Sequence, residues 1–230
     1  MTDRRRVFPS SPAVTPDLAT AKVQRRDRIV TAATELAHFG YDSCQMRAVA
    51  AIAGVAASTV YLYFPSKDDL LLACLRRWLR AFGDEIHTSE GGSANGYARL
   101  LLVFELLTAR LSGTPGLADA MIRPYLYAQG PAAEHAQRVR DQIVEIFSAA
   151  MADSYPAALR SNIADMVTDV WATNLSSVAQ QRTPLTELTT RLAHVLAAVE
   201  RREDARIRRD ATEPHTRPGR PGAASRSLAV

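Results

Sequence analysis

The sequence predicts an all-α protein of about nine helices. Apolar residues recur at helical rather than strand spacing in nearly every segment between residues 21 and 202. The chain has 230 residues, of which 47% are hydrophobic and 23% are charged, so it can bury a substantial core. Glycine and proline divide the helical pattern into segments at Gly40, Gly54, Pro65, Gly91-Gly92, Pro115-Gly116, Gly130-Pro131, Pro156 and Pro184.

Four helices are expected in the first third of the chain, at about 23–39, 46–53, 57–63 and 66–82. The first has an apolar stripe along one side and stops at Gly40. The second and third are short and meet at Gly54, which permits a tight turn. Ser66 is placed to cap the fourth helix, where Asp68 and Asp69 suit the positive end of the helix dipole.

Five further helices are expected at about 97–111, 117–127, 132–151, 157–180 and 184–202. The first of these contains LLLVFELL and is apolar nearly all round, so it should lie inside a helical bundle. The predicted organisation is a flexible basic arm (1–20), a helix-turn-helix domain (21–67), a ligand-binding and dimerisation domain (68–202) and a disordered tail (203–230). Residues 68–82 form the helix that links the two domains.

Charge is distributed unevenly along the chain, although its net value is only +4. Residues 1–80 carry 12 basic and 7 acidic side chains, whereas residues 81–200 carry 8 basic and 13 acidic ones. A basic front end joined to an acidic middle indicates that the front end meets a polyanion. Charged chain ends without a polyanionic partner are the alternative.

Two short helices joined by a glycine-containing turn form a helix-turn-helix, which presents its second helix to the DNA major groove. Ser58, Thr59 and Tyr61 on that helix have side chains that can reach base edges. Tyr63 and Lys67 lie where the third helix meets the fourth, so they can hold backbone phosphates. Arg47 supplies the guanidinium for a bidentate contact with guanine.

This stretch resembles the amino-terminal module of the tetracycline-repressor (TetR) family of transcriptional regulators. The shared motifs are F-G-Y at 39–41, M-R-A-V-A at 46–50, G-V-A at 54–56, T-V-Y-x-Y-F-P-S-K at 59–67 and leucines at 70–72. The resemblance implies that Gln45, Tyr63 and Lys67 contact phosphates and that Arg47 and the third helix face the groove. The candidate DNA-binding residues are Gln45, Arg47, Ala57, Ser58, Thr59, Tyr61, Leu62, Tyr63 and Lys67.

The last two helices carry apolar stripes that could pair across a twofold axis as a four-helix dimer interface. The alternative is that both stripes face the core of their own chain. The family resemblance favours a homodimer, and two recognition helices related by a dyad would read a palindrome. The candidate dimerisation residues are Val167, Val170, Leu188, Leu192, Val195 and Val199.

A narrower resemblance within the family concerns residues 117–139 and 165–183, which are similar to the actinobacterial repressors of cholesterol catabolism. It implies a role in steroid or lipid breakdown and an inducer such as a steroid or fatty acyl coenzyme A thioester. A long apolar ligand needs a deep apolar pocket with few polar anchors. The candidate ligand-binding residues are Leu100, Phe104, Leu107, Met121, Tyr125, Trp171 and Asn174.

Two positions depart from that subgroup, because Ser58 and Leu62 stand where it has a glycine and an arginine. Leu62 cannot donate a hydrogen bond, so the operator or the inducer can differ. The alternative function is therefore a repressor of the same fold that responds to drugs or other metabolites. Asn174 is a polar amide among apolar residues and needs a partner, either a ligand or another side chain.

Other functional classes find little support in the sequence. No phosphate-binding glycine loop or nucleophile motif is recognisable, and the five histidines are scattered. We therefore predict no catalytic residue, no metal site and no cofactor, and regard a helical enzyme or a pure interaction protein as unlikely rivals. The expected protein is a cytoplasmic DNA-binding repressor, not associated with a membrane, in which ligand binding swings the linking helix and separates the recognition helices.

Overall fold

The computed structural model describes residues 18–88, 95–152, 154–179 and 182–212. Within these residues the chain forms nine helices and no strand, so the predicted all-α class is confirmed. The helices are α1 (Leu18–Ala37), α2 (Met46–Ala53), α3 (Ala57–Tyr63), α4 (Lys67–Thr88), α5 (Gly96–Gly113), α6 (Pro115–Tyr127), α7 (Pro131–Ala150), α8 (Ala157–Ala179) and α9 (Leu185–Thr212).

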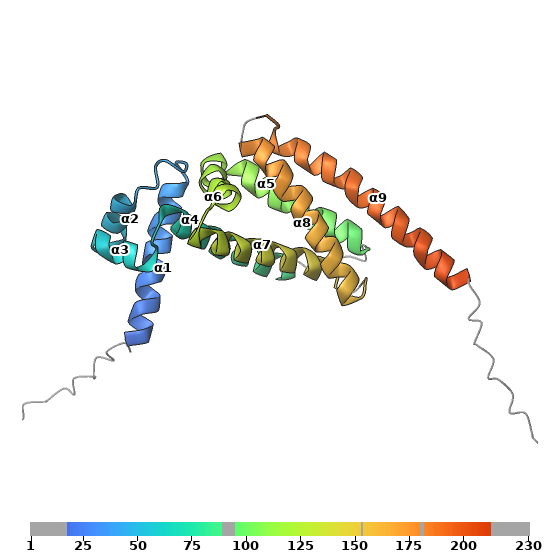
Figure 1. The fold of residues 1–230 in the computed structure, drawn as a ribbon, viewed down its shortest axis with the longest axis horizontal. Helices are drawn as coiled ribbons and strands as arrows, with labels where there is room; N and C mark the ends of the chain where they lie inside the picture. Colours follow the sequence, from blue (N-terminus) through green and yellow to red (C-terminus); the bar gives the residue numbers. More distant parts are fainter. Residues whose placement is uncertain (1–17, 89–94, 153, 180–181, 213–230) are drawn as a thin grey trace, which may run out of the picture.

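The helices form two groups that share α4. Figure 1 shows α1, α2 and α3 at one end of the molecule and α5 to α9 at the other. We call the first group the reader and the second the bundle. Helix α4 contacts α1 in the reader and both α6 and α7 in the bundle. A displacement of α4 would therefore change contacts in both the reader and the bundle.

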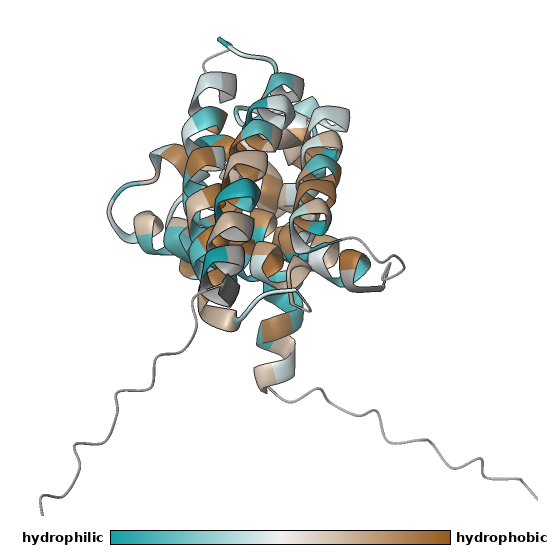
Figure 2. Ribbon diagram, turned by 90° about the vertical axis from the view of Figure 1, so that its right-hand side faces the viewer, coloured by the Kyte–Doolittle hydropathy of each residue, from teal (hydrophilic) through white to brown (hydrophobic). Residues whose placement is uncertain are grey.

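Apolar side chains form a continuous core through both groups. In the reader, Ile29 of α1, Val49 of α2 and Val60 of α3 are fully buried. In the bundle, Phe104 and Phe147 are fully buried, and Figure 2 shows hydrophobic residues gathered on the inner sides of the helices. Burial of such side chains is the main favourable contribution to folding.

The two ends of the helical region differ from the prediction. Helix α1 begins at Leu18, so the end of the predicted arm is helical, and residues 1–17 lie outside the described residues. Helix α9 continues to Thr212, so the predicted disordered tail is wrong for residues 203–212. The sequence EDARIRRDAT contains no glycine or proline, and its opposite charges recur three or four residues apart, which supports a helix without an apolar stripe.

Helix α5 was expected inside the bundle, but one of its sides is open. Leu102 and Leu106 are exposed, one turn apart, while Leu100 and Phe104 face the core. The prediction was wrong for this side because nearly uniform hydrophobicity does not show which sides neighbouring helices cover. Among the described residues, no single helix is long and apolar enough to cross a membrane; only the bent pairs α2 with α3 and α5 with α6 reach that length and composition together.

Candidate nucleic-acid interface and ligand bundle

The predicted helix-turn-helix is formed by α2 and α3, whose axes meet at 105°. Gly54 makes the turn with φ 64° and ψ 43°, a left-handed conformation that residues with side chains rarely adopt. The Val55 N–H donates to the Ala50 carbonyl at 3.0 Å and closes the end of α2. The hinge predicted at Gly54 is confirmed, and its backbone conformation explains why the position is glycine.

Small side chains let α3 lie close to α2. Ala50 and Ala53 on α2 are buried, and Val60 is the buried residue of α3. Phe64 follows α3 into the core, with the Arg26 guanidinium of α1 lying 5.1 Å from its ring centroid. With Val60 anchored inward, the other side of α3 is turned out of the reader.

The outward side of α3 carries three of the candidate DNA-binding residues. Ser58 is exposed, Tyr61 is 50% exposed and Leu62 is 82% exposed. The other α3 candidates, Ala57, Thr59 and Tyr63, are half-buried. So much exposed apolar and aromatic surface on a seven-residue helix is suited to contact with a groove rather than to packing in the subunit.

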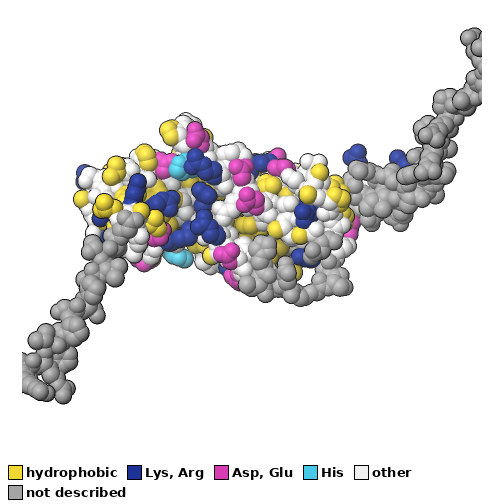
Figure 3. Space-filling view, turned by 90° about the horizontal axis from the view of Figure 1, so that it is seen from below, with side chains coloured by type: hydrophobic (Ala, Val, Ile, Leu, Met, Phe, Trp, Pro, Cys, Tyr) yellow, Lys and Arg dark blue, Asp and Glu magenta, His cyan; other side chains and the backbone are white. Residues whose placement is uncertain are grey.

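Two further candidates are exposed at the start of α2. Arg47 makes no side-chain hydrogen bond or ion pair with any residue that the structure describes, so its guanidinium is available. Gln45 is held in place, because its Nε2 donates to the Asp42 carbonyl at 2.8 Å. In the view of Figure 3, the largest gathering of Lys and Arg side chains lies toward the end of the molecule that carries α1.

Lys67, the predicted phosphate contact at the start of α4, is half-buried beside an aromatic ring. Its Nζ lies 3.8 Å from the centroid of Tyr41, a cation–π contact. The predicted cap is confirmed, because the Asp69 N–H donates to Ser66 Oγ at 3.1 Å. In return, the Ser66 N–H and hydroxyl donate to Asp69 Oδ2 at 3.0 and 2.8 Å, which fixes the position of Lys67.

Tyr41 joins the start of α4 to α6 of the bundle. Its hydroxyl donates to Asp68 Oδ1 at 2.8 Å, and the Arg123 guanidinium of α6 lies 4.7 Å from its ring centroid. Burial and the hydrogen bond to Asp68 raise the pKa of Tyr41 to about 12. Sequence reasoning used Tyr41 only as part of the F-G-Y motif and missed its place beside Lys67.

Helix α6 also contacts backbone atoms of the reader. The Tyr41 N–H donates to Asp119 Oδ2 at 3.0 Å, and Gly116 lies against the His38 carbonyl. The bundle is therefore connected to the loop between α1 and α2 as well as to α4. No local sequence pattern predicts this contact, because Tyr41 and Asp119 are 78 positions apart.

Most of the candidate ligand-binding residues meet in the bundle. Leu100, Phe104, Leu107, Met121 and Trp171 are buried. Three rings form a cluster, with Phe104 and Phe147 lying 6.5 and 6.4 Å from Trp171 between centroids. Tyr125 is half-buried, and burial raises its pKa to about 12.

Two polar atoms in this apolar region lack partners. Thr108 Oγ1 and Trp171 Nε1 are buried and have no hydrogen-bond partner among the described residues. By contrast, the Asn174 Nδ2 donates to the Val170 carbonyl at 2.7 Å, and its Oδ1 accepts from Arg191 Nη1 at 3.3 Å. The amide that was expected to need a partner, either a ligand or another side chain, thus has protein partners, and the groups without a described partner are Thr108 and Trp171.

Comparison with known proteins identifies the family. The model of bacterial regulatory proteins of the tetR family matches residues 29–74, and the model of the tetracyclin repressor-like C-terminal domain matches residues 93–198. The HTH-type transcriptional repressor KstR of Mycobacterium tuberculosis is 35% identical over 173 residues, which cover 75% of this chain and 79% of that protein. The chain belongs to the TetR family. Its members are regulators and not enzymes.

Solved structures have the same fold as this TetR-family chain. A TetR transcriptional regulator from Rhodococcus sp. RHA1 superposes with a TM-score of 0.68 at 24% identity, covering 77% of this chain and 96% of that one. Thermus thermophilus FadR, a TetR-family repressor in complex with lauroyl-CoA, superposes with a TM-score of 0.61 at 18% identity, covering 86% of this chain and all of that one. At these identities the likeness establishes the fold alone.

The candidate dimerisation residues of the TetR-family bundle divide into two groups. Val167 and Leu192 are fully buried inside the subunit, so assigning them to an interface was wrong. Each stripe has to cover the subunit's own core before it can serve a partner. Val170, Val195 and Val199 are half-buried and stay candidates, while the side chain of Leu188 lies outside the described residues. Met166, on the outer side of α8, is exposed.

Proposed function

We propose that this TetR-family protein is a homodimeric repressor that leaves a palindromic operator when an acyl-CoA-type ligand enters its bundle. The observation that carries the proposal is the single helix α4, which begins at Lys67 beside the DNA-reading surface and continues along the apolar bundle. A ligand that displaces α4 changes the separation of the two recognition helices in a dimer. Ligand and operator then weaken each other's binding by the same factor.

Support for the regulated pathway comes from relatives. KstR, which is 35% identical over three quarters of this chain, is a transcriptional repressor, and FadR of similar fold binds lauroyl-CoA. We infer that the ligand is a steroid or fatty acyl thioester and that the regulon serves its breakdown. The aromatic cluster around Trp171 suits an apolar chain, and the unpartnered Thr108 hydroxyl suits one polar group on it.

The proposal that DNA is the partner rests on the exposed side chains of α2 and α3. Arg47 and Tyr61 offer polar groups to base edges, while Leu62 offers an apolar surface that fits a thymine methyl group. One such short helix covers too few base pairs to single out a site, so a twofold dimer with half-sites about 34–36 Å apart is required. Such a repressor works in the cytoplasm, where its operator is found.

One experiment tests the DNA and ligand parts separately. The protein purified from its host is analysed by native mass spectrometry for retained small molecules, and duplexes are selected from a random pool with ligand-free protein. The proposal predicts a retained acyl-CoA or steroid thioester and a selected palindrome. A bundle that retains no such compound, even after incubation with acyl-CoAs, would remove the ligand assignment, and a pool without palindromic enrichment would remove the operator assignment.

A further inference from the structure

A cleft of about 530 Å³ lies between α4 and α7, outside the apolar cluster of the bundle. Leu79 and Ile146 contribute apolar side chains to it, and charged side chains from both helices surround them. A volume of this size is within the range of about 300–1,000 Å³ found for small-molecule sites. Because α4 forms one wall of the cleft, a ligand bound there would contact the helix that begins at Lys67.

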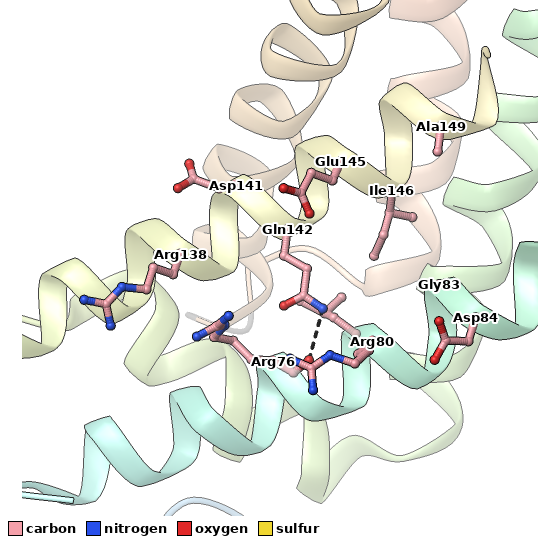
Figure 4. Close-up of a pocket in the computed structure, with 11 residues that line it drawn as sticks. Arg76, Arg80, Gly83, Asp84, Arg138, Asp141, Gln142, Glu145, Ile146 and Ala149 are labelled. Atoms are coloured by element: carbon pink, nitrogen blue, oxygen red, sulfur yellow. Dashed lines mark hydrogen bonds between the residues drawn. The ribbon is translucent and has the colours of Figure 1, made fainter.

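Two of the three arginines of the cleft have no partner among the described residues. Neither Arg76 nor Arg80 makes a side-chain hydrogen bond or an ion pair with any residue in the described part of the chain. Arg138 has only a long contact of 3.5 Å with Glu134, one turn away on its own helix. Figure 4 shows Arg76 and Arg138 at the same end of the cleft, projecting from opposite walls. Arg76 and Arg80 are four residues apart on α4, and guanidinium groups without partners favour binding of an anion with several oxygens.

Two buried atoms between the walls also have unused hydrogen-bonding capacity. Arg76 Nε and Gln142 Oε1 are buried without a partner, although the Gln142 Nε2 donates to the Arg76 carbonyl at 3.1 Å. This bond joins α7 to α4 directly across the cleft (Figure 4). Buried donors and acceptors are normally satisfied, so an unused donor and an unused acceptor at one site indicate a missing polar partner.

Three carboxylates also line the cleft. Asp84 of α4 and Glu145 of α7 line it and make no ion pair with a described residue, whereas the third carboxylate, Asp141, accepts from Gln137 at 2.8 Å. The cleft therefore offers both cations and hydrogen-bond acceptors. A simple anion would use only the first, while a nucleotide has phosphates for the arginines and amino or hydroxyl donors for the carboxylates.

We propose that the cleft between α4 and α7 binds the phosphorylated nucleotide of a coenzyme A thioester, with its phosphates at Arg76 and Arg80. This inference rests on the proposed function, since it places the head of the ligand whose acyl chain enters the bundle. The side of α7 opposite the cleft carries Phe147, which contacts Trp171. A chain that runs from the cleft to this cluster has to pass between α4 and α7, so binding separates the two helices.

The test uses the full-length protein and four probes: coenzyme A, palmitoyl-CoA, palmitate and inorganic pyrophosphate. Arg80 is exposed, so Arg80→Gln leaves the core intact, and it is measured alone and together with Arg76→Gln. Each lost arginine is expected to weaken coenzyme A binding about tenfold, as for loss of a charge-assisted hydrogen bond, with palmitate binding unchanged. Arg201→Gln removes an exposed arginine from α9 and is the matched control, expected to bind like the wild type.

The outcomes separate this inference from the proposed function. If Arg80→Gln and the double variant bind coenzyme A as tightly as the wild type, while palmitoyl-CoA still releases DNA, the cleft assignment is wrong and the repressor assignment stands. If pyrophosphate binds as tightly as coenzyme A, the cleft is a general anion site and the nucleotide assignment is wrong. If palmitoyl-CoA and other acyl-CoAs do not bind the wild type at all, both proposals fall.

Discussion

Gly116, near the start of α6, lies directly against the backbone carbonyl of His38, just beyond the end of α1. A Cβ atom on residue 116 would stand 2.0 Å from His38 O and 3.2 Å from the Gly40 nitrogen. Contacts this short to backbone atoms are not tolerated, so only glycine permits α6 and the reader to meet in this way. The contact gives the bundle a second connection to the DNA-binding residues, besides α4.

Replacing Gly116 with alanine should separate α6 from the reader. We expect Gly116→Ala to lower the free energy of unfolding by about 1–3 kcal/mol, the usual cost of forcing extra atoms into a packed contact. Urea unfolding measures this change. Gly113→Ala is the control, because a Cβ there meets nothing within 4 Å, and it should be neutral or slightly stabilising. Equal stability of the two variants would mean that the backbone around Gly116 and His38 can shift at little cost in free energy.

Arg47 is the side chain that we expect to distinguish one base pair. Arg47→Ala should weaken binding to the selected operator by about 1–3 kcal/mol and relax the preference at one position of each half-site. Fluorescence anisotropy with the operator and with its single-base variants measures both effects. Loss of the same size on random duplex DNA would show that Arg47 only contacts phosphate.

Thr108 and Thr168 provide a matched pair inside the bundle. The Thr168 hydroxyl donates to the Ala164 carbonyl at 2.7 Å, whereas the buried Thr108 hydroxyl has no partner among the described residues. Thr108→Val should therefore stabilise the ligand-free protein by about 1 kcal/mol, and Thr168→Val should destabilise it by a similar amount. Urea unfolding of the two variants decides the matter, and destabilisation by both would mean that the Thr108 hydroxyl is satisfied.

Cys74 should make the free energy of unfolding depend on pH in the alkaline range. Burial raises the pKa of its thiol from 9.0 to about 12, so the folded state holds the proton more tightly than the unfolded state. The stabilisation that comes from keeping this thiol protonated is fully present below pH 9 and is lost as the pH rises toward 12. We expect the unfolding free energy of Cys74→Ala to fall less between pH 8 and pH 11 than that of the wild type. Parallel curves would contradict the raised pKa.

Much of the fold follows from local sequence signals. Gly54 has the left-handed conformation that its place between two short helices requires, and Ser66 caps α4 as its spacing to Asp69 indicates. These features depend on residues within a few positions of one another, which a sequence displays directly. The helical extension to Thr212 was missed because alternating charge without an apolar stripe is shared by exposed helices and disordered tails.

The residues that connect the reader to the bundle could not be predicted in the same way. Tyr41 meets Arg123 of α6, and Gly116 meets His38, because α6 packs against the end of α1 and the loop that follows it. The burial of Val167 and Leu192 likewise depends on how α8 and α9 pack, since an apolar stripe does not state whether it faces its own core or a partner. Contacts between distant segments are set by packing, which periodicity alone does not determine.

The most direct test of the account is the affinity of the purified protein for the palindromic duplex that it is proposed to select. Fluorescence anisotropy measures this affinity with and without palmitoyl-CoA or another acyl-CoA that the protein binds. Coupling through α4 predicts that saturating acyl-CoA weakens operator binding by about 5–150-fold, while binding to random DNA changes little. Operator affinity that stays the same when the bundle is occupied would contradict the account.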